Sequence, residues 1–180
     1  LDDSVLEEFS LDALSWDTVS RYRAVVSAVR PNHPWLKLDD EELLVKLNAI
    51  GRTNGEGEFH PTRAGLLMFG FEHEIVKEYA NYFLDYREAD HERRWADRIV
   101  SQDGTWTGNL FDFWTEALPR LTGGLKKPFA LDSNLQRIED TEMHAAIREA
   151  LANALVHSDY YGRRGIVALR YSDRIEIANP

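Results

Sequence analysis

The chain has 180 residues, a formal net charge of −10 and no cysteine, and 43% of its residues are hydrophobic. This size and composition predict one domain or one and a half, with a sizeable, aromatic-rich core. The negative charge argues against non-specific binding to nucleic acid, which needs Lys and Arg to replace counterions, and the absence of cysteine excludes disulfides and thiolate metal sites.

The sequence shows no targeting or membrane-spanning signal. It has no signal peptide, and no apolar run approaches the length that crosses a membrane. We therefore expect a cytoplasmic protein with no membrane partner. Because the chain starts without Met and stops at Asn179–Pro180, directly after a strand-like run, we also expect it to be part of a longer protein.

The N-terminal quarter predicts helices. Residues 1–14 are acidic with interspersed apolar residues, which predicts a docking segment or a short helix. Ser15 is a suitable N-cap for a helix that continues to about Arg30. Asp39 or Asp40 caps a further helix over residues 41–50, whose leucines face inward.

A glycine-rich loop over residues 51–60 precedes a short helix from Pro61 to Gly70. Proline suits the first position of a helix because its missing N–H would have no partner there. The connection between the flanking helices is about ten residues long, whereas a helix-turn-helix needs about three or four. With the acidic charge, this length argues against a DNA-reading motif here.

The middle of the chain mixes strand and helix patterns. Residues 79–88 alternate between apolar and polar side chains, which predicts a strand with one wetter face. Residues 90–98 are highly charged and expected to be solvated, and residues 102–105 predict a turn. Apolar spacing predicts a helix over residues 110–121, and an extended connection follows over residues 128–138.

The stretch from Asp140 to His157 predicts one long helix, with Asp140 as its N-cap. Apolar residues recur every four positions and predict its buried stripe: Met143, Ile147, Leu151 and Leu155. A polar line runs beside that stripe on a surface expected to be buried: Glu149, Asn153 and His157. Residues 166–171 and 174–178 then predict a hairpin. The whole pattern predicts an α+β fold, with a helical N-terminal part followed by a mixed or antiparallel sheet packed on helices.

The polar line is the candidate functional feature. The carboxylate of Glu149 can act as a general base on a water molecule, and the amide oxygen of Asn153 can ligate a hard cation such as Mg²⁺. The alternative is a buried polar pair that bonds to neighbouring protein groups, and spacing alone favours this alternative. No phosphate-binding loop of the Gly-x-x-x-x-Gly-Lys-Ser/Thr type is present, which excludes ordinary helicase motor chemistry.

Residues 148–160, together with a hairpin that closes on residues 173–180, resemble a family of bacterial and archaeal transcriptional regulators often labelled "ATP-dependent DNA helicase RecG-related". Proteins of this family carry an N-terminal Schlafen AlbA-type DNA-binding domain, a middle region and a C-terminal domain similar to GHKL ATPases. Other segments are similar to the family's middle region: residues 61–70, 81–88 and 103–110.

The resemblance implies two regions. Residues 1–124 would be a middle, coupling region, and residues 125–180 the N-terminal portion of a truncated GHKL-ATPase-like domain. Glu149 would then polarise the attacking water, and Asn153 would hold Mg²⁺ on ATP. Asn179 falls where GHKL enzymes have the Asp that reads adenine, and His157 could contact the ligand or simply complement the helix dipole. DNA would be contacted by domains outside this sequence.

Two functions therefore remain open. The first is part of a nucleotide-responsive regulatory domain in a DNA-associated regulator. The second is a non-catalytic structural or dimerisation module that has lost nucleotide binding, with a second copy as partner. ATP and Mg²⁺ are the cofactors implied, but we expect neither tight binding nor activity from these residues alone, because the lid glycines are absent. A weaker third reading is an unrelated hydrolase that uses Glu149 and His157.

Overall fold

The structure is a computed structural model that describes residues 4–55, 57–89, 95–125 and 141–180. These residues form two compact units that interleave along the chain. Unit 1 extends to Tyr82 and includes Ser101–Asp112, and unit 2 comprises Phe83–Val100 and Phe113–Pro180. The division predicted at residue 124 concerns family regions rather than compact units, and it stays a prediction.

The architecture is α+β, as predicted. Helices are combined with a two-stranded sheet and a four-stranded sheet in the part of the chain that the structure describes. No helix within these ranges is both long and apolar enough to cross a membrane.

Unit 1 is mainly helical. Its elements in chain order are η1 (Leu11–Ala13), α1 (Trp16–Val29), η2 (Pro34–Lys37), α2 (Asp40–Lys46), β1 (Ile50–Gly51), η3 (Thr53–Gly55), β2 (His60–Pro61), α3 (Arg63–Phe69), α4 (Glu72–Glu78) and η4 (Ser101–Asp103). One buried cluster joins α1 to the segments from α2 to α3: Leu14, Val19, Leu44, Ala49, Ile50 and Phe69.

The predicted caps of α1 and α2 are confirmed. The Ser15 hydroxyl accepts a hydrogen bond from the backbone N–H of Thr18 (3.2 Å). Asp39, rather than Asp40, caps α2 in a reciprocal capping box with Glu42. The helix ends at Lys46, earlier than expected, and Asn48 has a positive φ of 55° that directs the chain into β1.

The predicted helix start at Pro61 is wrong. Pro61 pairs with Ile50 in the two-stranded sheet, and α3 begins after Thr62. The Thr62 hydroxyl accepts from the N–H of Gly65 (3.0 Å) and donates to the carbonyl of Asn48 (2.7 Å). This threonine therefore both caps α3 and ties it to the end of α2.

The acidic N-terminal segment is a docking segment within unit 1, which is one of the two forms that the sequence predicted for it. Val5 forms a β-bridge with Thr62, and the N–H of Leu6 donates to the carbonyl of Pro61 (2.9 Å). Leu6 and Phe9 are buried, whereas the acidic Glu7, Glu8 and Asp12 are exposed.

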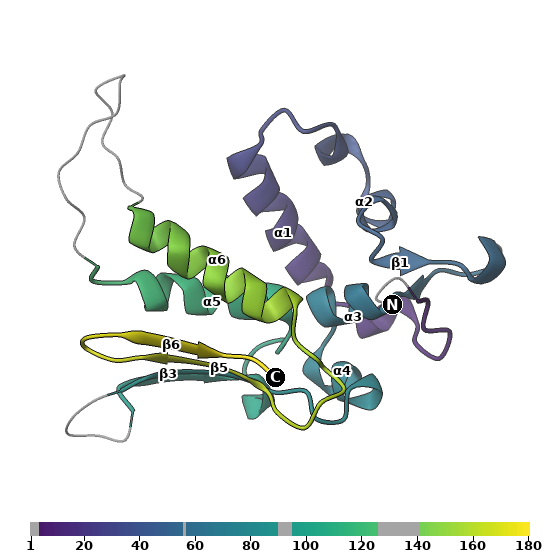
Figure 1. Ribbon diagram of the computed structural model, residues 1–180. Helices are drawn as coiled ribbons and strands as arrows, with labels where there is room; N and C mark the ends of the chain where they lie inside the picture. Colours follow the sequence, from purple (N-terminus) through teal and green to yellow (C-terminus); the bar gives the residue numbers. More distant parts are fainter. Residues whose placement is uncertain (1–3, 56, 90–94, 126–140) are drawn as a thin grey trace. The chain divides into compact units, whose positions relative to one another are not determined.

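Unit 2 is a mixed sheet with helices on one face (Figure 1). Its strands are β3 (Leu84–Glu88), β4 (Asp97–Val100), β5 (Ile166–Arg170) and β6 (Ile175–Ala178), in the order β4-β3-β5-β6. β3 and β5 are parallel and the other neighbours antiparallel. The helices are α6 (Glu142–Val156) and most of α5 (Leu110–Thr122), because the unit boundary falls after Asp112.

The hairpin of β5 and β6 and the helix α5 are confirmed where the sequence predicted them. The strand predicted over residues 79–88 is shorter, because only Leu84–Glu88 is extended. Its expected wetter face is also wrong: Asp85 is fully buried and accepts hydrogen bonds from Arg87 and Arg98. The connection predicted over residues 128–138 lies outside the described residues.

Candidate functional site

The candidate site is built on α6, whose start differs from the prediction. The predicted N-cap, Asp140, lies outside the described residues, and the helix is capped by Thr141 instead. The Thr141 hydroxyl accepts from the backbone N–H of His144 (3.4 Å) and also lies 2.7 Å from the Nδ1 atom of that side chain.

The predicted buried stripe of α6 is confirmed for Ile147, Leu151 and Leu155 and is wrong for Met143. Met143 was expected in the core but is 59% exposed. The buried residues of α6 are His144, Ile147, Leu151, Ala154 and Leu155. A strict four-residue repeat drifts around a helix with 3.6 residues per turn, so a core face cannot follow it over this length. The ring of His144 enters the core because Thr141 satisfies its Nδ1 atom.

The polar line of α6 faces solvent, not the core, so its predicted burial is wrong. Glu149, Asn153 and His157 are all exposed. The structure brings the first two together: the Asn153 amide nitrogen donates to the Glu149 carboxylate (3.0 Å). Because that bond uses only the amide nitrogen, the amide oxygen of Asn153 stays available to a further partner.

His157 occupies the C-cap position of α6. Its backbone N–H donates to the carbonyl of Asn153 (3.0 Å), and its side chain is exposed beside the negative end of the helix dipole. Asn179 directly follows β6 and is also exposed. Its side chain is not among those that line the groove described next.

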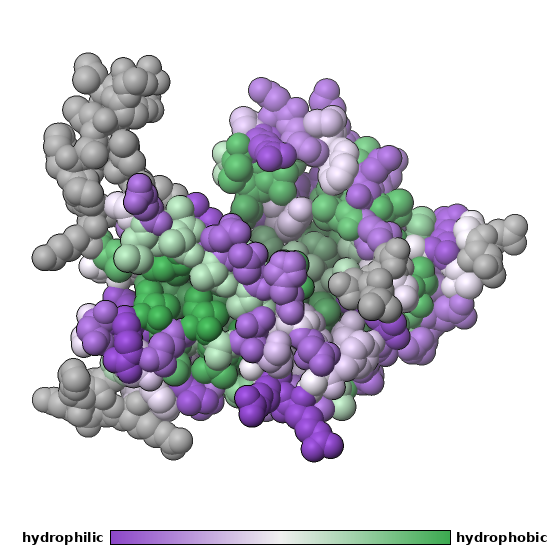
Figure 2. Space-filling view, in the orientation of Figure 1, coloured by the Kyte–Doolittle hydropathy of each residue, from purple (hydrophilic) through white to green (hydrophobic). Residues whose placement is uncertain are grey.

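A groove of about 560 Å³ runs along α6 and β6 within unit 2. Figure 2 shows a hydrophobic surface between these two elements. The apolar lining from α6 and β6 consists of Met143, Ala146, Ile147, Ala150, Ile175 and Ile177. On a helical wheel, Met143, Ala146 and Ala150 lie between the buried face and Asn153. None of Glu149, Asn153 and His157 lines the groove.

Arg170 lines this groove and binds the end of α5. Its guanidinium donates to the carbonyls of Arg120 (2.8 Å) and Gly123, and lies 3.5 Å from the carboxylate of Glu88. Gly124 follows with a φ of +73°, and a Cβ atom there would lie 3.3 Å from the guanidinium. Paired glycines therefore let a cation approach the negative end of α5 closely.

The donor set of the polar line fits a magnesium ion carried by a phosphate, but not a protein-only metal site. An amide oxygen and a carboxylate are hard oxygen donors, which suit Mg²⁺ when phosphates supply further ligands. Among the residues that the structure describes, no group of three or more His, Asp or Glu side chains could hold a metal alone.

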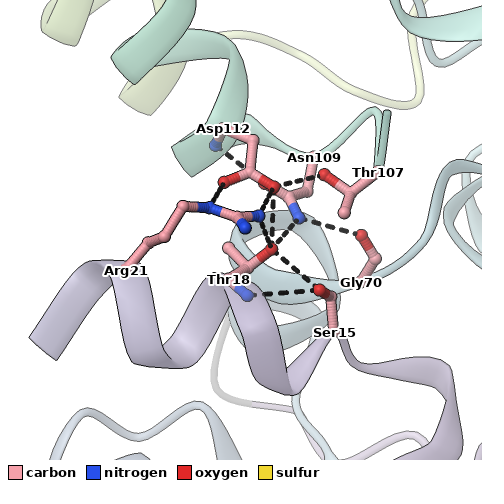
Figure 3. Close-up of polar contacts among 7 residues, drawn as sticks. All are labelled: Ser15, Thr18, Arg21, Gly70, Thr107, Asn109 and Asp112. Carbon is pink, nitrogen blue, oxygen red and sulfur yellow. Dashed lines mark hydrogen bonds and ion pairs between the residues drawn. The ribbon is translucent and has the colours of Figure 1, made fainter. Parts of the chain in front are cut away.

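A second polar cluster, in unit 1, was not predicted from the sequence (Figure 3). Asp112 accepts a two-pronged interaction from Arg21 (3.0 and 2.7 Å) and further hydrogen bonds from the hydroxyls of Thr18 (2.7 Å) and Thr107 (2.5 Å). Asn109 caps the first turn of α5 by accepting from the N–H of Asp112 (2.9 Å). The sequence signal was weak: an Asn followed three residues later by an acid.

The environment of Asp112 sets its protonation. Burial alone would raise the pKa of this carboxyl, but the hydrogen bonds from Arg21, Thr107 and Thr18 and the charge of Arg21 outweigh it, so the pKa is lowered. The carboxylate is therefore ionised at neutral pH and fully bonded. We interpret this cluster as structural, because its polar groups are occupied by one another.

Comparisons with known proteins show a similar fold but indicate no activity. A family model described as a domain of unknown function (DUF8451) matches residues 1–85. No curated protein matches the chain. The crystal structure of the DIP2311 protein from Corynebacterium diphtheriae is similar, with a TM-score of 0.65 and 18% sequence identity. That similarity covers 100% of this chain and 33% of DIP2311, so the chain spans about a third of that protein's length.

Proposed function

We propose that this chain carries part of a nucleotide-binding regulatory domain of a DNA-associated transcriptional regulator of the RecG-related type. Residues 125–180 would form the N-terminal portion of its GHKL-like ATPase domain, and residues 1–124 would couple that domain to DNA-binding domains elsewhere. The observation that carries the proposal is the Glu149–Asn153 pair, exposed on α6 three residues from Ala146 and Ala150, which line an apolar groove.

Each part of the site has a chemical role in this proposal. The Asn153 oxygen would ligate Mg²⁺, which neutralises charge on the triphosphate. The Glu149 carboxylate would orient and deprotonate the attacking water. The apolar walls of the groove would suit a nucleobase, and Asn179 and His157 would be further candidates for contact. An amide at Asn179 offers both a donor and an acceptor to a base edge, where a carboxylate would offer acceptors only.

Calorimetric titration of the chain with a magnesium complex of a non-hydrolysable ATP analogue tests the proposal. We expect weak, saturable binding that is lost in Asn153→Ala and retained in Asn153→Asp, because the aspartate keeps an oxygen ligand. Glu149→Gln should retain binding, since its role is in hydrolysis. Ser20→Ala, an exposed change on α1, serves as the control. Equal heats for wild type and Asn153→Ala would contradict a site at this residue.

The second candidate is a structural module without nucleotide binding. It is favoured by the hydrogen bond between Glu149 and Asn153, which lets each polar group satisfy the other, and by the neutral amide at position 179. In this case no variant should bind nucleotide at millimolar concentration, whereas the folding stability of Asn153→Ala should stay within about 0.5 kcal/mol of wild type.

A further inference from the structure

A cavity outside the candidate site lies within unit 1, between the second half of α1 and the chain that passes through η2 into α2 (Figure 1). Its volume is about 420 Å³, which is in the range of small-ligand pockets. Its two walls are mainly apolar: Val25, Val26 and Val29 on α1, and Trp35, Leu36 and Leu43 on the facing segment. Such a cavity can enclose a small apolar molecule.

The second half of α1 has no buried residue. The buried residues of this helix, Thr18 and Val19, both lie near its start. Val25 and Val26 are only partly buried, and Val29 is 73% exposed. Contiguous exposed apolar surface of this kind is typical of binding sites. The valines of α1 are therefore available to a ligand in the cavity.

Arg23 fixes the spacing of the two walls. Its guanidinium donates to the carbonyls of Leu36 (3.2 Å) and Leu38 (2.8 Å) and to the carboxylate of Asp40 (2.6 Å). These bonds tie α1 to the facing segment, so the cavity is preformed, as small-molecule sites usually are. They also occupy Arg23, which therefore supports the cavity rather than contacting a ligand.

Three other polar side chains of the lining can donate hydrogen bonds to a ligand. The Arg30 guanidinium and the Tyr22 hydroxyl make no hydrogen bond or ion pair to the residues that the structure describes. The Nδ1 atom of His33 accepts from the N–H of Trp35 (3.3 Å), which leaves the ring proton on Nε2. Because the guanidinium and this Nε2–H can only donate, the cavity calls for a ligand group that accepts.

The cavity is cationic although the chain as a whole is acidic. Its charged lining residues are Arg23 and Arg30, and no acidic side chain belongs to the described lining, in a chain with a formal charge of −10. A carboxylate would satisfy the free donors through charge-assisted hydrogen bonds. The negative end of the α1 dipole lies near Arg30 and opposes an anion, so we expect modest affinity.

We infer that this cavity binds a small apolar carboxylic acid. The carboxylate lies between Arg30 and His33, and the hydrocarbon body covers the valines of α1. Tyr22 comes roughly 12 Å before Arg30 along the helix, so an extended acid of medium chain length spans the cavity. The cavity is in unit 1, and the inference therefore neither uses nor requires nucleotide binding at α6.

An NMR titration with octanoate, and with octanol as its uncharged match, tests the inference. The indole N–H signal of Trp35, assigned by its loss in Trp35→Phe, should shift saturably with octanoate. In Arg30→Gln the dissociation constant for octanoate should rise about fivefold, because a partly exposed ion pair contributes up to about 1 kcal/mol. Octanol should bind wild type and Arg30→Gln equally, since it carries no charge.

Two further variants serve as a control and a second test. Arg163→Gln, an exposed change of the same kind in unit 2, should leave octanoate binding unchanged. Val29→Glu puts a carboxylate at an exposed position of the wall and should weaken octanoate binding more than octanol binding. Equal octanoate affinity in wild type and Arg30→Gln, or octanol binding as tight as octanoate binding, would overturn the inference. So would a Trp35 signal that does not move at millimolar octanoate.

Discussion

Arg21 on α1 and Asp112 in the first turn of α5 form a two-pronged ion pair, with Nε to Oδ1 at 3.0 Å and Nη2 to Oδ2 at 2.7 Å. The carboxylate is almost fully buried, whereas the arginine side chain is 51% exposed. The pair joins residues that are 91 positions apart in the sequence, and it holds the two segments of unit 1 together.

Asp112→Asn should destabilise the chain by about 2 kcal/mol at pH 7, measured by urea unfolding. The variant loses charge-assisted hydrogen bonds from Arg21, Thr18 and Thr107 and brings an amide donor against them. The cost stays below that of a fully buried pair because Arg21 can turn into solvent. Glu8→Gln, an exposed change of the same charge, should stay within about 0.5 kcal/mol of wild type. Equal losses in both variants would contradict a special role for Asp112.

The stabilisation by Asp112 should depend on pH with a defined sign. Burial opposes ionisation, but Arg21 and the two threonines lower the pKa below its ordinary value of about 3.9. Because its pKa is lower in the folded than in the unfolded state, the ionised carboxylate stabilises the fold at pH values above the unfolded-state pKa. This stabilisation is lost as the pH falls through the folded-state pKa. The stability gap between wild type and Asp112→Asn should be constant from pH 7 to about 5 and shrink below about 4. A gap that widens in acid would contradict this assignment.

Tyr86 should make the folding stability fall at high pH instead. Its hydroxyl is buried and makes no hydrogen bond to the described residues. Burial and the charge of Glu88 raise its pKa to about 12, against an opposing effect of the nearby Arg170 guanidinium. Because its pKa is higher in the folded than in the unfolded state, the neutral phenol contributes its full stabilisation below about pH 10. This stabilisation is lost as the pH rises toward 12. Wild type should lose stability over this range relative to Tyr86→Phe. At pH 7 the two should be within about 1 kcal/mol, because the removed hydroxyl has no partner.

Gly65→Ala should destabilise unit 1 strongly. A Cβ atom at this position of α3 would lie 1.8 Å from the carbonyl oxygen of Ala49, which is backbone and cannot turn aside. We expect a loss of about 3 kcal/mol or more in the free energy of unfolding. The matched change Gly162→Ala, where the nearest atom would be at 3.0 Å, should cost clearly less. Similar losses at both positions would show that the close approach of α3 to the Ala49 backbone is not what constrains Gly65.

The sequence predicted elements whose signals are local. Ser15 and Asp39 were identified as caps because a cap depends on a few neighbouring residues. Pairing between distant segments was missed: β1 and β2 have two residues each, too few for a periodic pattern, and their pairing moved the start of α3 from Pro61 to Arg63. The sequence placed Asp85 on a solvated face, because only the folded structure shows that Arg98 lies beside it.

The candidate site was likewise predicted only where its geometry depends on residues close in the sequence. The adjacency of Glu149 and Asn153 follows from helical spacing, and their hydrogen bond confirms it. Their exposure was not predicted, because an exact four-residue stripe placed Met143 in the core and left out His144. The Asp112 cluster could not be predicted, since it joins Thr18 and Arg21 to residues about ninety positions away.

The central claim is that α6 presents a magnesium–nucleotide site at Asn153. Its most direct test replaces Mg²⁺ by paramagnetic Mn²⁺ in complex with a non-hydrolysable ATP analogue and records backbone amide NMR signals. The account predicts selective broadening of signals from residues near Glu149 and Asn153, absent in Asn153→Ala and absent with Mn²⁺ alone at the same concentration. Broadening that is spread over unit 1, or that persists unchanged in Asn153→Ala, would contradict it.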